Sequence, residues 1–268
     1  MLLTLASRSL ASQMSAAGDG KPFPGKLTML ELPDFAIRQL QLRGLNVPAS
    51  MFAGWSLQDL DRLRDRADKA GCPCLVLIED TPLELGHADP QRRDAAAERV
   101  RRLAAAAHRL SCNALALACD GPDDDDTFDL AAEEIRNLMP RVERMELNIL
   151  LAPHEGLTFS PDRLTDLIKR IGGFRIGSLP SFGHAAATGD PIGTLRKLAP
   201  YAGAVQATIE GFTPGGKHRG PDLAECVEAI RSVGFLNTLA IDYVGKKDPI
   251  QQIEKARAIL QNAIDAEQ

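Results

Sequence analysis

Four titratable side chains follow apolar runs of the chain and are candidates for acid–base chemistry. They are His154, His184, Glu210 and Asp242. Each stands at or just after the end of a short apolar segment, where a strand of an α/β protein gives way to a loop. An imidazole titrates near neutral pH and a carboxylate accepts a proton, so a His154–Asp242 pair would form a general base if the two loops converge. These residue types therefore favour proton transfer.

Two of these candidates also have ordinary structural interpretations. His184 stands alone, and a lone imidazole is as typical of a bond to a neighbouring carbonyl as of a base. Glu210 lies four residues after Gln206, and strand alternation points both side chains to the same face. Gly211 follows at once and indicates a turn in which Glu210 would be a solvated carboxylate. Both interpretations stay open for each residue.

Two acidic groups along the chain invite a metal-site interpretation. Glu79 and Asp80 end an apolar run, with His87 in the loop that follows, and Asp123–Asp126 is a run of four carboxylates. Consecutive side chains cannot all converge on one ion, and acidic residues interact favourably with a helix N-terminus. We therefore predict solvated loop and helix-start positions for these groups.

The segment PGGKHRGPD, residues 214–222, is the best candidate for binding an anionic ligand. Its two glycines allow a close backbone approach, and Lys217, His218 and Arg219 supply positive charge. Pro221 is suited to begin a helix whose N-terminus would favour a phosphate or a carboxylate. A plain surface loop is the alternative interpretation.

Composition excludes several classes of protein. A net charge of −5 argues against a phosphate-binding surface for nucleic acid, and no apolar run reaches the length of a membrane span. The five cysteines are odd in number and lack paired CxxC spacing, so a reducing compartment, the cytoplasm, is expected. Cys72 and Cys74 flank one proline between a helix and a strand, where a structural role is expected.

The elements that must position these side chains alternate in type along the chain. Ser56 is a predicted N-cap with Asp59 three residues later, and Gly71 ends that helix. Further helices are expected at Met29–Arg43, Asp89–Leu110 and Pro249–Ala263, and a glycine-rich loop at Gly18–Gly25. We expect strands at Leu2–Ser7, Leu45–Ser50, Leu75–Ile78, Asn113–Cys119, a run ending at Ala152–His154, a run ending at Pro180–His184, Ala204–Glu210 and Thr238–Tyr243.

Eight βα units without a break in composition predict a closed (β/α)8 barrel that spans residues 1–268 as a single domain. A doubly wound open sheet is the alternative. That fold usually has a glycine-rich turn after its first strand, and residues 7–12 contain no glycine. The barrel is therefore preferred.

Several segments together resemble the sugar phosphate isomerase/epimerase family, the xylose isomerase-like TIM barrels that also include endonuclease IV. The segments are ILLAPHEGLTFSPDRLTDLIKRIG, IGSLPSFGH, DPIGTLRKLAPYAGAVQA and GFLNTLAIDYVGKKDP. The resemblance implies an α/β TIM barrel that binds a sugar or sugar phosphate and moves a carbon-bound proton through an enediol, with a divalent metal held at the barrel mouth. A DNA-repair activity like that of the endonuclease branch is excluded, because it requires many histidine ligands and a basic surface, and this chain has five histidines.

Carried over residue by residue, the metal site of the resembling family is not retained. Its strand-five Glu falls on Ala152, its strand-six Asp on Ser181, its strand-seven His on Gln206 and its strand-eight Glu on Asp242. A Glu of the second strand is replaced by Asn46. Since lost anionic ligands weaken metal binding steeply, no metal and no other cofactor is expected, and Mn, Mg, Co or Zn would bind only in a rearranged site.

Two functions stay open after this comparison of residues. The first is an isomerase or epimerase whose acid–base groups are His154, His184, Glu210 and Asp242, with Ser181, Gln206 and the 217–219 cations as substrate contacts. The second is a non-catalytic barrel that binds a small molecule and has lost the ion. Neither predicts a nucleic-acid or membrane partner, and the sequence leaves the oligomeric state open.

Overall fold

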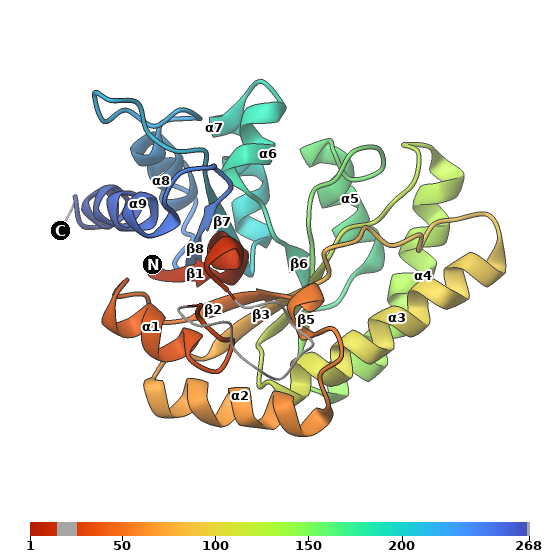
Figure 1. Cartoon of the computed structure of the whole chain (residues 1–268). Helices are drawn as coiled ribbons and strands as arrows, with labels where there is room; N and C mark the ends of the chain where they lie inside the picture. Colours follow the sequence, from red (N-terminus) through yellow and green to blue (C-terminus); the bar gives the residue numbers. More distant parts are fainter. Residues whose placement is uncertain (15–25, 267–268) are drawn as a thin grey trace.

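The computed structural model describes residues 1–14 and 26–266, and its centre is one sheet of eight parallel strands (Figure 1). The strand order is β6-β5-β4-β3-β2-β1-β8-β7, so sequential strands are paired neighbours except for β6 and β7 at the two edges. All eight predicted strands are present, but the sixth ends at Ser178, and the predicted end of that run, Pro180–His184, extends into a helix that begins at Phe182. The strands are β1 Leu2–Ala6, β2 Leu45–Pro48, β3 Cys74–Ile78, β4 Ala114–Leu117, β5 Asn148–Leu151, β6 Ile176–Ser178, β7 Ala204–Ile209 and β8 Thr238–Tyr243.

The two edges of this sheet meet, which closes it into a barrel. Strand β6 is only three residues long, and isolated parallel bridges join Ser178 to Ala202 and Ser181 to Gln206. The backbone N–H of Gln206 donates to the Pro180 carbonyl at 2.9 Å. The predicted (β/α)8 barrel is therefore confirmed, with β6 and β7 as its seam.

Helices follow the strands and surround the sheet (Figure 1). None of the helices in residues 1–14 and 26–266 combines the length and apolar character that crossing a membrane requires. The α-helices are α1 Leu32–Arg38, α2 Leu57–Ala70, α3 Pro90–Arg109, α4 Asp125–Arg144, α5 Pro161–Ile171, α6 Phe182–Ala187, α7 Pro191–Leu198, α8 Leu223–Arg231 and α9 Pro249–Asp265. Short 3-10 helices are η1 Ser7–Gln13, η2 Ala49–Phe52 and η3 Ala199–Tyr201.

Helix ends follow from local side-chain chemistry. The Ser56 hydroxyl accepts from the Asp59 backbone N–H, and the Asp59 carboxylate returns a bond to the Ser56 backbone, which completes a capping box at α2. Gly71 ends the same helix with a φ of 68°, a conformation that favours glycine. Asp124 caps α4 by accepting from the Thr127 N–H, so the four-carboxylate run begins a helix as expected.

The first helix is shorter than its pattern predicts. We expected Met29–Arg43, and α1 covers Leu32–Arg38. The Glu31 carboxylate bonds the backbone and side chain of Thr28 in a turn before the helix, and Gln41 takes a φ of 55° after it, which ends the helical path. The predicted loop at Gly18–Gly25 lies outside the described residues.

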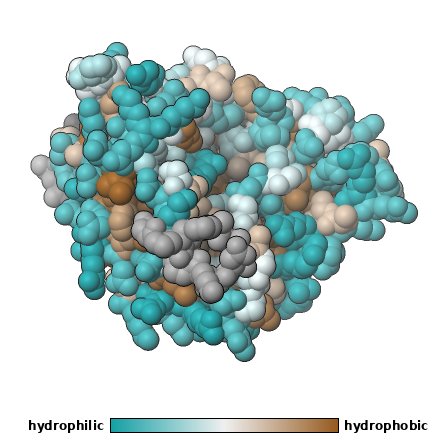
Figure 2. Space-filling view, in the orientation of Figure 1, coloured by the Kyte–Doolittle hydropathy of each residue, from teal (hydrophilic) through white to brown (hydrophobic). Residues whose placement is uncertain are grey.

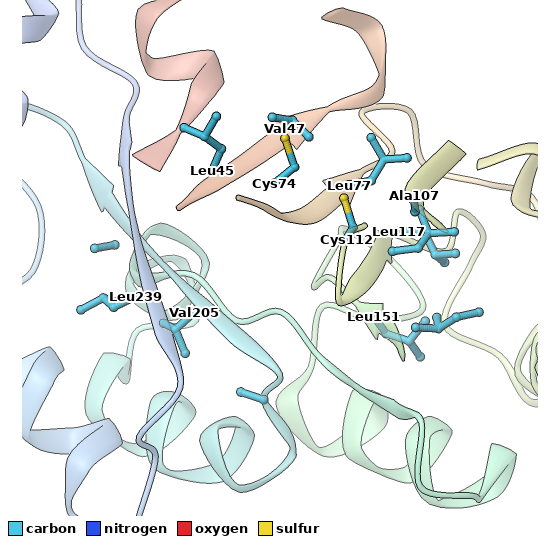
Figure 3. Packing of buried hydrophobic residues seen from close by; sticks show 14 of the residues in the cluster. Leu45, Val47, Cys74, Leu77, Ala107, Cys112, Leu117, Leu151, Val205 and Leu239 are labelled. Carbon is cyan, nitrogen blue, oxygen red and sulfur yellow. The ribbon is translucent and has the colours of Figure 1, made fainter. Parts of the chain in front are cut away.

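The main core lies between the barrel and the helices. Figure 3 shows Cys74 and Cys112 there among apolar side chains that include Val47 and Leu77. All five cysteines are buried and free. Burial raises the pKa of Cys74 to about 12, so this thiol stays protonated at neutral pH. The thiols accordingly serve as small apolar groups of the core.

Candidate functional site

The barrel interior has a polar wall and an apolar wall. Leucine, valine and other apolar residues of β1, β2, β7 and β8 pack outward in the main core, and strand alternation turns the residues between them inward. The buried polar residues among those turned inward are Thr4, Asn46, Gln206 and Asp242. A separate apolar cluster consists of Val76, Ala114, Ala116, Leu150, Leu179 and Ala204.

An ion pair between Arg8 and Asp242 occupies the polar wall at the barrel mouth. Arg8 lies two residues beyond β1, and Asp242 lies near the carboxyl end of β8, 234 positions away in sequence. The Arg8 Nε donates to Asp242 Oδ1 at 2.7 Å, and its Nη2 donates to Oδ2. Both oxygens of Asp242 are therefore bound by one planar guanidinium, the strongest geometry available to such a pair.

The two side chains of this ion pair differ in their exposure to solvent. The Asp242 side chain is 0% exposed, whereas that of Arg8 is 48% exposed. The hydrogen bonds that Arg8 donates to Asp242 raise the pKa of Arg8, and the nearby charge of Asp80 acts in the same direction. Asp80 is held in place by the Ser50 backbone N–H, which donates to its carboxylate at 2.9 Å. The mouth thus carries one permanent cation and two carboxylates.

Three polar atoms of the same wall have no hydrogen-bond partner among the described residues. They are the Thr4 hydroxyl and both the oxygen and the nitrogen of the Asn46 amide, and both residues are 0% exposed. Asn46 is in register with Ala6 on the neighbouring strand, and Ala6 lies two residues before Arg8. Because unpaired buried polar atoms cost free energy, this wall is built for a polar occupant.

Two predicted catalytic residues have reactive groups free at the mouth. His154 uses its backbone N–H to bond Thr158, and its imidazole has no hydrogen-bond partner in the described part of the chain. The Glu210 backbone N–H donates to His218 Nε2, and its exposed carboxylate is likewise without a partner among residues 1–14 and 26–266. His154 follows β5 and Glu210 follows β7.

The other two predicted catalytic residues are engaged elsewhere. Asp242 bonds Arg8, and nowhere in the described residues does it bond His154. His184 Nε2 bonds the Phe159 carbonyl at 2.8 Å, the structural arrangement that the sequence left open. Burial lowers the pKa of His184, so its ring is neutral near pH 7. Ser181 accepts from the His184 N–H and caps α6.

The predicted anion-binding loop is organised around a buried histidine. His218 Nδ1 donates to the Pro221 carbonyl at 2.8 Å, and His218 Nε2 accepts from the Glu210 backbone N–H at 3.2 Å. The side chains of Lys217 and Arg219 are exposed. Within the described residues, neither makes a hydrogen bond or an ion pair that would hold it beside a ligand. We expected Pro221 to begin the helix, but α8 begins at Leu223 with Asp222 as its cap.

A carboxylate of the chain itself occupies the first turn of α8. The Asp222 carboxylate accepts from the backbone N–H groups of Ala224 and Glu225, the donors that an external anion would need. A phosphate would have to displace this carboxylate. The first turn of α8 is therefore filled by the chain's own negative charge.

The acidic group at β3 separates into two parts. The Glu79 carboxylate turns outward and bonds Arg99 Nε of α3 at 2.6 Å. His87 lies in the loop before α3, where its ring bonds the Asp89 N–H and Arg92. Neither residue reaches the mouth, so only Asp80 of this group belongs to the candidate site.

The residues at the mouth do not fit a divalent metal. The four positions that the resemblance aligns with metal ligands carry Ala152, Ser181, Gln206 and Asp242, and the Arg8 guanidinium already holds both oxygens of Asp242, the one anion of these four. Within the described ranges, no three His, Cys, Asp or Glu side chains lie close enough to share an ion. A bound cation would also face the positive charge of Arg8.

Sequence reasoning missed Arg8. A single arginine in SRS after the first strand has the pattern of a surface residue, and its partner is at the other end of the chain. The available signal was its place just beyond the carboxyl end of the first strand, where the loops of a barrel carry functional residues.

Comparison with known proteins places this geometry in context. A family model described as xylose isomerase-like TIM barrel matches residues 36–263. None of the curated proteins compared with the sequence matches it. The match covers all strands but the first, so Thr4 and Arg8 of the candidate site lie outside the matched range.

Solved structures share the whole fold at low identity. An L-ribulose 3-epimerase superposes with a TM-score of 0.82 at 14% identity, covering 99% of this chain and 95% of the other. A D-psicose 3-epimerase in the presence of D-fructose gives 0.74 at 14%, covering 98% and 97%. A protein named IOLI with a bound zinc atom gives 0.73 at 11%, covering 98% and 96%. Identities this low show the shared fold alone.

Proposed function

This chain belongs to the xylose isomerase-like TIM barrel family, and from that premise we propose that it binds a sugar-class small molecule in its barrel mouth without a divalent metal. The proposed ligand site lies at the carboxyl ends of the strands, the usual site of this fold. The proposal differs from metal-dependent isomerisation in that no divalent metal takes part. No nucleic-acid or membrane partner belongs to it. The buried free thiols fit a reducing compartment, so the proposed location is the cytoplasm.

The observation that carries this proposal is the Arg8–Asp242 ion pair. A carboxylate that accepts two charge-assisted hydrogen bonds has little capacity left to ligate an ion, and the remaining aligned positions offer a methyl group, a hydroxyl and an amide. The same wall still presents polar groups for hydroxyl-rich ligands.

A metal-free isomerase or epimerase is the second candidate, because two acid–base groups at the mouth are uncommitted. The His154 imidazole and the Glu210 carboxylate have no hydrogen-bond partners among the described residues, so either is free to accept a carbon-bound proton. Their strands are separated by β6 alone. This candidate requires the substrate to lie between them.

Calorimetric titration with a panel of pentoses and hexoses in the presence of EDTA tests the first proposal. Saturable binding that EDTA leaves unchanged is the expected result. Binding only after Mn²⁺ or Zn²⁺ is added would contradict it, as would no binding across the panel.

The second candidate is tested by proton NMR of each bound sugar in D₂O. Loss of a carbon-bound proton signal that the His154→Gln and Glu210→Gln variants abolish would establish catalysis. Binding without exchange would leave a non-catalytic binding barrel.

A further inference from the structure

A cavity opens at the end of the barrel opposite the mouth. Its volume is about 700 Å³, and it is lined by residues at or just before the amino ends of β3 to β8. Layers of bulky side chains usually fill a barrel of this kind. Here Ala114, Gly177 and Gly203 contribute little or no side chain, and a Cβ on Gly203 would lie 2.6 Å from a methyl carbon of Leu150. This end of the barrel is therefore hollow.

The lining of this cavity has an apolar base and a polar rim. Val76 and Leu150 are buried and belong to the base, and the partly buried Leu75 packs against them. The Asn148 side-chain nitrogen donates to the Asn113 carbonyl at 2.9 Å. The polar side chains of the rim are Asn113, Glu146, Asn148, Arg175 and Asn237. An apolar centre with a polar border is the usual anatomy of a contact between proteins.

Large apolar side chains project from the same face into solvent. Phe174, which lines the cavity, is 104% exposed, Leu236 is 72% exposed and Leu2 is 42% exposed. The Leu2 backbone N–H donates to the carbonyl of Asn237 at 3.1 Å, so Leu2 and Leu236 lie beside the cavity rim. By contrast, the face of the molecule drawn in Figure 2 is mostly hydrophilic. Apolar residues that are exposed together mark contact surfaces.

The shape of this face matches a second copy of the same chain. A small molecule in the cavity would leave Phe174, Leu236 and Leu2 in water, so covering them requires a protein surface. A projecting phenylalanine and a cavity lie side by side on one chain. A two-fold rotation brings the Phe174 of each copy to the cavity of the other, so that one contact is made twice.

The charges of the rim are also complementary to themselves. Arg175 Nη1 donates to the Glu146 backbone carbonyl at 2.8 Å, which holds the two residues side by side. The Glu146 side chain is exposed, and neither its carboxylate nor the Arg175 guanidinium forms an ion pair within residues 1–14 and 26–266. Under a two-fold rotation, each arginine meets the glutamate of the other copy.

We propose that this face, made of Phe174, Leu2, Leu236, Glu146 and Arg175 around the cavity, is the contact face of a two-fold symmetric homodimer. The Phe174 ring of each copy occupies the cavity of the other. Because the contact lies at the amino ends of the strands, both barrel mouths stay open to solvent. Aromatic side chains that fill a pocket dominate the binding free energy of such contacts, so association depends most on Phe174.

Analytical ultracentrifugation of the full chain over a range of concentrations tests the proposal. The wild-type protein is expected to form a species of twice the chain mass of 28.9 kDa. Phe174→Asp should weaken this association by at least about tenfold, because it removes the aromatic ring and places a charge at the cavity. The melting temperature of the wild type should rise with protein concentration, and that of Phe174→Asp should not. Circular dichroism establishes that the variant is folded.

Leu57→Asp is the matched control. Leu57 is 60% exposed and is the first residue of α2, at the mouth end of the barrel. The change adds the same charge at a helix N-terminus, where a carboxylate is favourable. This variant should associate like the wild type. Equal loss of association in Leu57→Asp and Phe174→Asp would assign the effect to charge alone and overturn the proposal.

A charge exchange tests the two-fold arrangement. Glu146→Arg and Arg175→Glu should each weaken association by about tenfold or more, because each places like charges opposite one another in both halves of the contact. The double variant Glu146→Arg/Arg175→Glu restores opposite charges and should recover most of the association. A double variant that associates no better than either single variant would contradict the two-fold contact.

Three results would overturn the proposal. The first is a wild-type protein that sediments as a single chain up to the limit of its solubility. The second is a dimer that Phe174→Asp leaves intact, since its contact would lie on another face. The third is a single chain of 28.9 kDa that carries a small molecule in native mass spectrometry and releases it in Phe174→Asp, which would assign the cavity to that molecule.

Discussion

Removal of Arg8 should destabilise the fold far more than removal of an exposed arginine. In Arg8→Met, Asp242 would remain on β8 with 0% exposure and without the two hydrogen bonds that hold its oxygens. Deleting one partner of a fully buried ion pair costs about 3–5 kcal/mol, and the 48% exposure of Arg8 places this pair toward the lower end of that range. Since domains are commonly stable by about 5–15 kcal/mol, this is a large share of the total.

The double variant Arg8→Met/Asp242→Leu separates the loss of the pair from the stranded charge. Replacing both members of a buried pair by apolar side chains is often neutral or stabilising, so most of the lost free energy should return. The control is Arg170→Met, whose partner is Asp129 and whose pair is 57% and 60% exposed. That change should cost less than about 1 kcal/mol.

Urea unfolding followed by far-UV circular dichroism gives the free energy of unfolding for each variant. The expected order is wild type close to Arg170→Met, then the double variant, with Arg8→Met clearly the least stable. The reasoning is refuted if Arg8→Met lies within about 1 kcal/mol of Arg170→Met, or if the double variant is no more stable than the single one.

Three further outcomes follow from the structure. Burial lowers the pKa of His184 below its ordinary value of 6.5, so this residue contributes stability above pH 6.5 that is lost as the pH falls, and His184→Gln should reduce the fall in wild-type unfolding free energy on acidification. Burial raises the pKa of Cys119 to about 12, so the native protein should not react with a thiol reagent at mildly alkaline pH, and reaction before unfolding would contradict this burial. A Cβ at Gly156 would lie 2.2 Å from the Gly121 carbonyl oxygen, whereas one at Gly54, which has the same φ of +79°, would meet nothing within 4 Å. Gly156→Ala should therefore lower the melting temperature more than Gly54→Ala, and equal effects would show that backbone strain alone matters.

The fold was predictable because its signals are local. The β8 strand could be placed at Thr238–Tyr243 from its apolar alternation, and α2 could be bounded by the cap at Ser56 and by Gly71. The length of α1 was overestimated, since the apolar stripe continues past the point where Gln41 leaves the helical conformation. The periodicity of apolar residues does not indicate the residue at which the backbone leaves the helical conformation.

The site was predictable only in part, since it depends on contacts between distant residues. Alternation along β8 indicates that Asp242 faces the interior, but its partner Arg8 is 234 positions away and has no motif around it. His218 was predicted to bind a ligand from its charge, and the structure shows both ring nitrogens bonded to the chain itself. Its role in ligand binding stays a prediction. The residue type determines which hydrogen bonds and proton transfers a side chain can make. The neighbouring residues in the fold determine which of them it makes.

A crystal structure of the protein grown with both MnCl₂ and D-fructose, measured at the manganese absorption edge, tests the central claim most directly. The account predicts electron density for the sugar in the barrel mouth, an intact Arg8–Asp242 pair and no anomalous peak at Asp242. A manganese peak on Asp242, with the guanidinium of Arg8 displaced from it, would contradict the account.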